Sequence, residues 1–341
     1  MPLTLTPVQT KTRHRNGIRA LSSVLALALP FFGLIFLGFF CGKLKKLPEA
    51  GLQWMNFFIV YVALPALFFK LISSAPFEQL ANWPYVIGTT LATYVAFALA
   101  FLIGIITMKG RIREATVQAV AGAYANIGYM GPGLTISVIG PEAIVPTALI
   151  FVFDNILLFT LVPFLMSLGG SEKMKFGETV WYIVKRVVTH PFNVSIAVAV
   201  VAAYFKFQPP AAIDTMLTFL KNAAAPVALF TMGVTVALRP VKTVPWEMPA
   251  LLFIKLILHP VAVFVILSFL GPFSREWMMT AVLMAALPPA LNVFVIANQY
   301  HVYVERASTA ILLGTMLSVG TVTALLWLIT ENKLPTSLFA F

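Results

Sequence analysis

The sequence is dominated by long runs of apolar residues, each about as long as a lipid bilayer is thick. A helix needs roughly 20 apolar residues to cross the hydrocarbon layer, and such runs recur along the chain with only short polar breaks between them. Hydrophobic residues make up 60% of the 341 residues and charged residues only 10%. One water-soluble core cannot bury that much apolar surface. The sequence therefore predicts an all-α membrane protein that crosses the bilayer many times.

Ten of these runs are predicted to be membrane-spanning helices, because a chain inside lipid must satisfy its backbone hydrogen bonds internally. The first run is as long as a full span and no small-residue cleavage site follows it, so we interpret it as a helix and not as a signal peptide. The predicted spans cover residues 23–41, 52–74, 84–108, 115–139, 143–167, 188–206, 214–238, 248–270, 276–299 and 307–330.

The longest polar break, residues 169–186, divides the spans into two sets of five. It predicts a cytoplasmic connecting loop between a first five-helix repeat, residues 1–168, and a second, residues 187–341. Because each repeat has an odd number of helices, the two would cross the membrane in opposite directions. The segment LPALFF in the second span matches APVALF in the seventh. The predicted fold is thus a 5+5 inverted repeat.

Basic residues are concentrated in alternate loops. The loops after the odd-numbered spans hold 13 Lys and Arg residues, whereas the opposite loops hold four, leaving the basic N-terminal segment aside. The positive-inside rule then places the odd loops in the cytoplasm and both termini outside. The net charge of +11 is accounted for by this topology and by contact with anionic lipids, so no nucleic-acid partner is predicted.

Two spans contain helix-breaking residues at corresponding positions. The fourth span reads NIGYMGPG at 126–133, and the ninth reads LPPALN at 287–292. Proline removes a backbone donor, and glycine tolerates the unwound geometry that follows. At membrane depth such a break persists only where it is buried in protein or lines a cavity. Both spans are therefore predicted to be interrupted near the middle of the membrane.

The breaks predict where two new half-helices begin. If the chain unwinds between Gly128 and Gly131, Pro132 can be the first residue of a half-helix, where its missing N–H costs nothing. Pro288 or Pro289 would do the same in the ninth span. Half-helices that begin at this depth direct their positive N-terminal ends toward the bilayer centre, which suits an anion such as a carboxylate.

Asn126 and Asn292 flank the two breaks. Each side-chain amide offers donors and an acceptor without placing a net charge in the membrane. We interpret the pair as substrate contacts; the alternative is that they only satisfy backbone carbonyls freed by the breaks. Asn56 and Asn222 occupy comparable places in the second and seventh spans, where they would line the substrate path or join helices.

Ionisable residues inside spans are costly in lipid and point to function. Asp154, with Asn155 beside it, falls near the middle of the fifth span and is a candidate proton or cation site; the alternative is a carboxyl group that only packs helices together. Lys255 either extends to the membrane surface along its long stem or acts as a substrate counter-ion. The four histidines include no HExxH pattern, so neither a metal site nor a cofactor is predicted.

Several segments together resemble the auxin efflux carrier family, which includes plant auxin carriers and bacterial malate and malonate permeases. They are GAYANIGYMGPGLTISVIGPEA (122–143), PPALNVFVIANQYHV (288–302), YVALPALFF (61–69), APVALFTMG (225–233) and GTMLSVGTVTALL (314–326).

The resemblance implies a ten-helix inverted repeat, similar to sodium/bile acid symporters, whose fourth and ninth helices cross at their proline breaks. It also implies organic anion substrates and homodimers. The long central loop of the plant members is not present, which favours a permease of the bacterial inner membrane. Carried onto this chain, the crossover residues would be Asn126, Gly131, Pro132, Pro288 and Asn292.

The predicted function is a secondary transporter that moves small organic anions, such as malate, malonate or auxin-like acids, by alternating access. Two alternatives are a sodium-coupled symporter of the bile-acid type and a membrane receptor that transports nothing. The ninth span lacks the Glu- and Gln-bearing pattern of the sodium symporters. No nucleophile with a base stands out at matching depth, so an enzyme is not predicted. Direction of transport and the coupling ion stay open.

Overall fold

The structure is a computed structural model that describes residues 26, 28–45, 49–170, 176–189, 191–238 and 244–339. The start of the first predicted span and part of the predicted connecting loop lie outside these residues. Shorter apolar helices occur at Ala28–Leu44 and Asn193–Tyr204. Longer helices, apolar enough to cross a membrane, are Gly51–Ile72, Trp83–Thr107, Pro141–Leu168, Ala211–Leu238, Met248–Leu270 and Val304–Thr330. The chain is thus an integral membrane protein.

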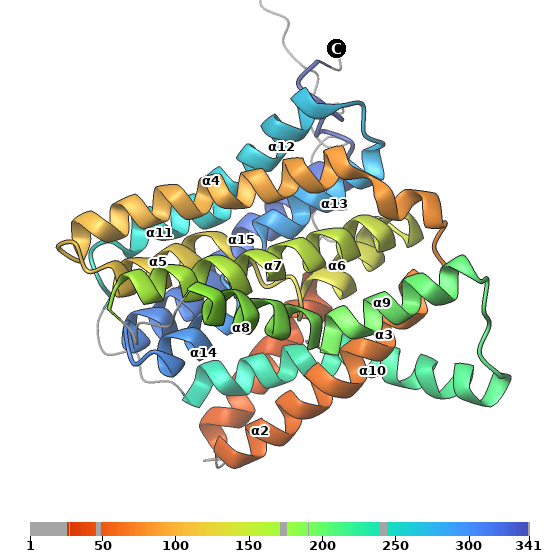
Figure 1. The fold of residues 1–341 in the computed structure, drawn as a ribbon, viewed down its shortest axis with the longest axis horizontal. Helices are drawn as coiled ribbons and strands as arrows, with labels where there is room; N and C mark the ends of the chain where they lie inside the picture. Colours follow the sequence, from red (N-terminus) through yellow and green to blue (C-terminus); the bar gives the residue numbers. More distant parts are fainter. Residues whose placement is uncertain are drawn as a thin grey trace, which may run out of the picture.

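One group of helices, here called the frame, lies across the lower part of Figure 1. Within it, α3 packs against α9 and α10, and α10 also packs against α2. The helix at 28–44 approaches α10 so closely that a Cβ atom on Gly233 would lie 2.0 Å from the backbone oxygen of Ile35. The frame consists of the helix Ala28–Leu44, α2 (Glu49–Phe58) continuing through a π-helical turn (Ile59–Ala63) into α3 (Leu64–Ile72), α9 (Pro191–Tyr204) and α10 (Ala211–Leu238).

A second group, here called the bundle, holds the other spans. In it α4 packs against α5 and α12, while α13 packs against α7, α12 and α15. Its helices are α4 (Trp83–Thr107), α5 (Ile112–Ala123), α6 (Gly131–Val138), α7 (Ile144–Leu168), α11 (Met248–Phe253) continuing through a π-helical turn (Ile254–Leu258) into α12 (His259–Leu270), α13 (Arg275–Ala286), α14 (Asn292–Gln299) and α15 (Val304–Thr330).

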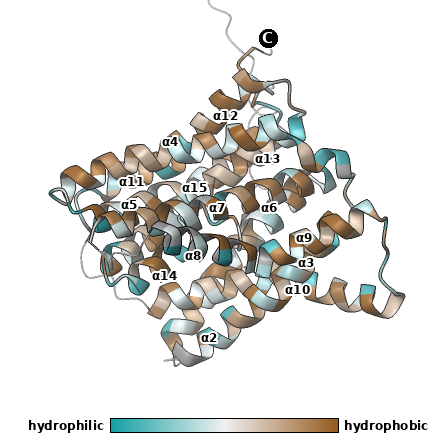
Figure 2. Cartoon of the chain, viewed as in Figure 1, coloured by the Kyte–Doolittle hydropathy of each residue, from teal (hydrophilic) through white to brown (hydrophobic). Residues whose placement is uncertain are grey.

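Hydrophobic residues follow the helices along their length, and hydrophilic ones occur toward helix ends and connections (Figure 2). On α4, Ile106 and Leu102 are exposed, although both are large and apolar. Such contiguous apolar surface is what a helix presents to lipid. The outer face of the bundle is therefore a lipid-facing surface, and its polar groups lie inside.

Part of the predicted connecting loop is instead helix α8, which spans Phe176–Thr189 and contacts α7 and α9. Trp181, Val184 and Val188 are exposed on it. Their spacing puts them on one helical face, and an apolar face beside charged residues is typical of a helix that lies along a membrane surface. Because charged residues lie between these apolar ones, the sequence alone predicted a loop for this segment.

The chain leaves helical geometry at both breaks. Residues 124–130 separate α5 from α6, and residues 287–291 separate α13 from α14. The two linkers run antiparallel and pair through their backbones: the N–H of Asn126 donates to the carbonyl of Pro288 at 2.8 Å, and the N–H of Ala290 donates to that of Tyr124 at 3.2 Å. Backbone groups freed by the breaks thus satisfy one another inside the bundle.

The prolines do not sit where the sequence predicts. Pro132 is the second residue of α6, after Gly131. Pro288 and Pro289 both precede α14, whose first residue is Asn292, so the prediction that one of them begins the half-helix was wrong. A residue before proline is driven toward extended geometry, and Leu287, which precedes Pro288, is extended here. The Pro-Pro pair therefore prolongs the linker.

Candidate functional site

A cavity of about 330 Å³ lies between the frame and the bundle. From the frame it is lined by Asn56, Val60, Tyr61 and Pro191, and from the bundle by Tyr129, Leu158, Val162, Pro163, Leu291, Asn292, Val295, Ile296, Gln299 and Tyr300. A smaller hollow of about 70 Å³ shares Val60, Tyr129, Leu291 and Asn292 with it and reaches the paired linkers. Together they form one path from the end of α14 to the breaks.

The predicted substrate residues fall into two sets. Asn292 lines both the cavity and the inner hollow, while Asn126 and Gly128 line the hollow only. Gly131 and Pro132 are buried behind this wall, and the backbone of Pro288 and Pro289 holds the linker pairing. The asparagines therefore line the open space, whereas the prolines lie in the linker and in the first turn of α6.

The two asparagines differ in their surroundings. Asn126 is buried, and its Nδ2 donates to the sulfur of Met232 in α10 at 3.0 Å. Asn292 is only partly buried and is the first residue of α14. Asn126 thus contacts the frame across the interface, and Asn292 faces the open space.

Both half-helices begin without a side-chain cap. Neither Met130 before α6 nor Leu291 before α14 accepts a hydrogen bond from the helix start through its side chain. At α14 the linker backbone accepts from the first turn, because the N–H groups of Val293 and Phe294 donate to the carbonyls of Ala290 and Leu291. The helix start still carries the positive end of the helix dipole. Since Leu291 and Asn292 line the hollow, the start of α14 presents a weak positive potential to it.

Aromatic hydroxyls connect the hollow to its walls. Tyr129 donates to Oδ1 of Asn56 on the frame at 3.4 Å, and Tyr124 donates to Oδ1 of Asn155 at 2.8 Å. Asn155 in turn donates to the carbonyl of Phe151 at 2.7 Å. Asn155 therefore reaches the hollow through one hydroxyl. Asn222, by contrast, is exposed on α10.

Asp154 faces away from the cavity into a buried chain of polar groups. Its Oδ1 is 3.1 Å from the hydroxyl of Thr93, which is 3.2 Å from Nε2 of His259. Nδ1 of His259 is 3.1 Å from the ammonium of Lys255. An ammonium can only donate, so His259 accepts at Nδ1 and carries its proton on Nε2. Thr93 then accepts from His259 and donates to Asp154, so these three hydrogen bonds run from Lys255 toward the carboxylate.

Lys255 is fully buried and donates to the carbonyl of Ala285 in the last turn of α13 at 2.6 Å. The prediction that its stem extends to the membrane surface was wrong, because the π-helical turn Ile254–Leu258 directs it inward against α13. A cation at the C-terminal end of a helix compensates the negative end of its dipole. Lys255 lines neither the cavity nor the hollow.

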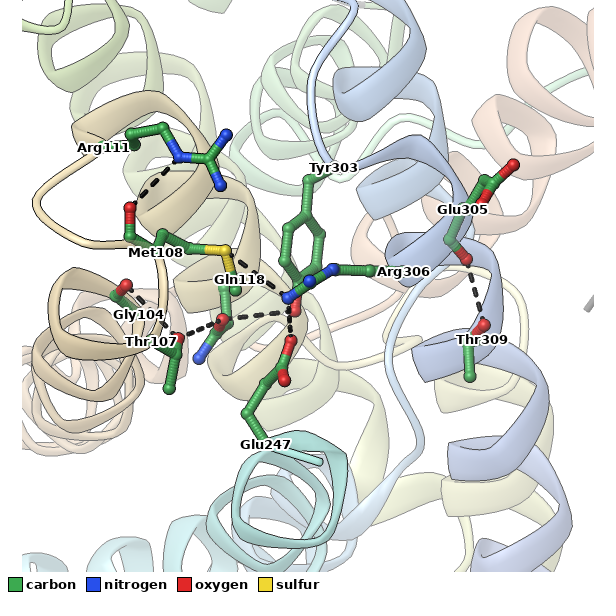
Figure 3. A network of polar contacts seen from close by, with 10 residues as sticks. All are labelled: Gly104, Thr107, Met108, Arg111, Gln118, Glu247, Tyr303, Glu305, Arg306 and Thr309. Carbon is green, nitrogen blue, oxygen red and sulfur yellow. Dashed lines mark hydrogen bonds and ion pairs between the residues drawn. The ribbon is translucent and has the colours of Figure 1, made fainter. Parts of the chain in front are cut away.

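A further network joins the ends of several bundle helices (Figure 3). Arg306 pairs with the buried carboxylate of Glu247, and the hydroxyls of Tyr303 and Thr107 both reach Oε1 of Gln118, at 3.2 and 3.3 Å. Burial, with help from Glu247, raises the pKa of Tyr303, so its hydroxyl keeps the proton it donates. The network fixes the ends of α4, α5, α11 and α15 as one unit.

Comparison with known proteins identifies the family. The sequence pattern of a family described as "Membrane transport protein" matches residues 23–328. The chain belongs to this family, the auxin efflux carriers. A protein of Rhizobium meliloti (strain 1021), named "Putative malonate transporter", is 48% identical over 319 residues, covering 94% of this chain and all of the relative. The resemblance seen in the sequence is therefore confirmed.

More distant relatives are also named as transporters. YfdV of Escherichia coli (strain K12), called an uncharacterized transporter, is 25% identical over 88% of this chain and 95% of its own length. An uncharacterized transporter of Methanothermobacter thermautotrophicus is 26% identical over 84% of this chain and 91% of its own. The chain is thus a membrane transporter of the auxin efflux carrier family.

Sequence reasoning missed several groups that the structure brings together. Thr93 gave no signal because threonine is common in membrane helices. Tyr129 lies inside the NIGYMGPG segment, and Tyr124 lies just before it. A polar aromatic residue beside a helix break is a signal that could have identified both as candidate site residues. His259 shares a helix face with Lys255, four residues away, which hinted at their contact. Among the described residues, no three of His, Cys, Asp and Glu gather as a metal site would require.

Proposed function

We propose that this carrier moves small organic anions by alternating access, with the hollow at the paired linkers as its substrate site. One observation carries the proposal: the cavity between the frame and the bundle ends at Asn126, Asn292 and the uncapped start of α14. Amide donors and a helix N-terminus bind a carboxylate without a full positive charge. In this scheme the bundle moves against the frame and exposes the site to each side in turn.

The proposal includes a ten-helix 5+5 inverted repeat in which the interrupted helices cross. Six long apolar helices, two shorter ones and the two interrupted spans α5–α6 and α13–α14 account for ten crossings. The antiparallel pairing of Ala125 with Pro289 supports a crossing at the linkers. The frame also supplies the proposed homodimer contact, and the bacterial inner membrane is the proposed location.

The open side of the site follows from the loop charges. Gln299 and Tyr300, at the outer end of the cavity, precede the short connection to α15, whose first turn holds Arg306, and the positive-inside rule places that connection in the cytoplasm. The structure then corresponds to a state open to the cytoplasm, with both termini outside. Closure on that side and opening on the other would complete the cycle.

A short dicarboxylate is the first substrate to test, because a relative that is 48% identical is named for malonate. The residues that line the site leave room for other small acids, including malate. The cavity volume of about 330 Å³ lies within the usual range of small-molecule sites, ~300–1,000 Å³. Substrate choice is therefore decided by the polar groups at the hollow more than by space.

Asp154 is the proposed coupling residue. Its carboxylate ends the donor chain from Lys255 through His259 and Thr93, so a proton that reaches this chain has a path to it. Asn155, next in sequence, bonds Tyr124 at the hollow, which places the proton site one residue from the substrate site. A buried carboxylate that gains or loses a proton changes the charge that the bundle carries as it moves.

The test is uptake of labelled malonate, malate and an indole acid into proteoliposomes, with pH, sodium and voltage gradients imposed separately. Saturable uptake of one acid that falls at least about tenfold in Asn292→Ala and Asn126→Ala supports the substrate site, because each loses a hydrogen bond to a charged ligand. Asn222→Ala, on an exposed site of α10, is the matched control and should transport normally.

The gradients test coupling separately. Uptake driven by a pH gradient in the parent protein, with a weaker response to that gradient in Asp154→Asn, supports Asp154 as the coupling residue. Asparagine keeps an acceptor for Thr93 but cannot take up a proton. Absence of uptake of any acid by folded protein would contradict the carrier itself, whereas equal pH responses in both proteins would contradict only the coupling role.

A further inference from the structure

We infer that the site selects singly charged carboxylates, so that a dicarboxylate is bound and carried as its half-protonated monoanion. The inference rests on the proposed function, because it specifies the ionic form of the substrate at the same site. It follows from what lines the site and from where the nearby cations are held.

None of the residues lining the cavity or the hollow in the described part of the chain is Lys, Arg, His, Asp or Glu. Two candidate cations are engaged elsewhere. Lys255 donates to Ala285 behind the linkers, and Arg113 donates to the carbonyl of Tyr300 at the outer end of the cavity. A ligand at the linkers thus has no side-chain cation beside it.

The remaining positive potential is small. A helix N-terminus is equivalent to about half an elementary charge. Here α14 begins in the wall of the hollow, whereas the first residues of α6, Gly131 and Pro132, do not line it. The helix ends near the hollow therefore balance at most about one negative charge. A second carboxylate would be buried without compensation, and burying an unpaired charge is strongly unfavourable.

The hydrogen-bonding groups favour the same form. Amide side chains at Asn126 and Asn292 both donate and accept, as does the hydroxyl of Tyr124. A carboxylate needs donors, whereas a carboxylic acid needs an acceptor for its proton. Such a lining can bind one carboxylate and one carboxylic acid of the same molecule. A lysine or arginine in these places could serve only the charged group.

The test measures binding of malonate and of two reference monoanions, monomethyl malonate and propionate, to purified protein across the second pKa of malonic acid. Isothermal titration calorimetry on the full chain in nanodiscs gives each dissociation constant. Any titration of the protein acts on all the ligands alike, so the ratio of the malonate constant to a reference constant isolates the proton on malonate.

Above that pKa, this ratio should rise about tenfold for each pH unit, because only the half-protonated fraction binds. A ratio that stays constant with pH, or malonate binding at high pH without binding of either reference, would overturn the inference and leave the carrier intact. If neither malonate nor the reference monoanions bind to folded protein, both the inference and the proposed function fail.

A charge placed in the cavity provides a second readout. Ile296 lines the cavity one helical turn from Asn292 on α14, so Ile296→Lys adds the missing cation on the same face. The pH dependence of the ratio should then weaken. Asn222→Lys adds the same charge to an exposed site outside the cavity and should keep the dependence of the parent protein. Equal pH dependence in the parent and Ile296→Lys would count against the inference.

Discussion

The frame and the bundle each hold a lysine and an aspartate from distant parts of the chain, but in opposite settings. In the frame, Lys70 and Asp214 form a direct pair at 2.6 Å, with 22% and 41% of their side chains exposed. In the bundle, Lys255 and Asp154 are buried and communicate only through His259 and Thr93. A pair at the surface is readily replaced by water. The buried groups have no such substitute, and ionisable groups buried inside a membrane protein point to function.

The difference extends to how each group is packed. In the frame, the helix at 28–44 and α10 meet through glycines that bring one backbone against the other. In the bundle, the close approach is between two unwound linkers whose backbones pair. Close helix packing through small residues gives a rigid contact. Unwound linkers instead place the start of α14 and amide side chains beside the hollow. The comparison indicates that the frame is the rigid support and that the bundle holds the chemically active groups.

Lys255→Met should have the largest effect on stability, about 3–5 kcal/mol, because it removes one partner and leaves a charged carboxylate in the buried chain. The Ala285 carbonyl also loses its donor. Thermal unfolding of purified protein in detergent measures the loss. Adding Asp154→Asn to this variant should recover most of it, since the uncompensated charge is then gone. If the single and double variants were equally stable, the proposed electrostatic difference between the frame and the bundle would be contradicted.

Gly233→Ala tests the rigidity of the frame. The added Cβ atom would lie 2.0 Å from the backbone oxygen of Ile35, and a backbone cannot move away as a flexible side chain can. We expect a loss of about 3 kcal/mol, at the upper end for overpacking. Gly33→Ala is the control in the same helix group, because a Cβ atom there meets nothing within 4 Å. Matching unfolding temperatures for the two variants would contradict the tight crossing.

The contact between Asn155 and Tyr124 tests whether the bundle links its two polar regions. Asn155→Leu leaves the Tyr124 hydroxyl without this acceptor, at a cost of about 1–3 kcal/mol, and should weaken substrate binding roughly tenfold by releasing a residue that lines the hollow. Tyr124→Phe removes the same hydrogen bond from the other side. Because the two changes share one interaction, their effects in the double variant should not add. Additive losses would separate Asn155 from the site.

Sequence reasoning found the features that depend on composition and missed those that depend on depth and register. Apolar length located the six long helices among the described residues, and a carboxylate in an apolar run marked Asp154. The direction of Lys255 could not be read, because it depends on a π-helical turn and on the carbonyl of Ala285, 30 residues away. The prolines of 288–289 fit a helix start and an extended linker equally well in sequence. Only the pairing with Asn126 selects the linker.

Lys70→Met should have the smallest effect, about 0–1 kcal/mol, because a partly exposed pair gains little over solvation of its separate charges. The same lysine-to-methionine change thus separates the two settings: it should barely change unfolding in the frame and should be severe at Lys255. High salt should reduce even the small effect at Lys70, since exposed charges are screened, while leaving the buried effect nearly unchanged. A loss at Lys70 as large as that at Lys255, and equally insensitive to salt, would mean that the frame also depends on a protected charge pair.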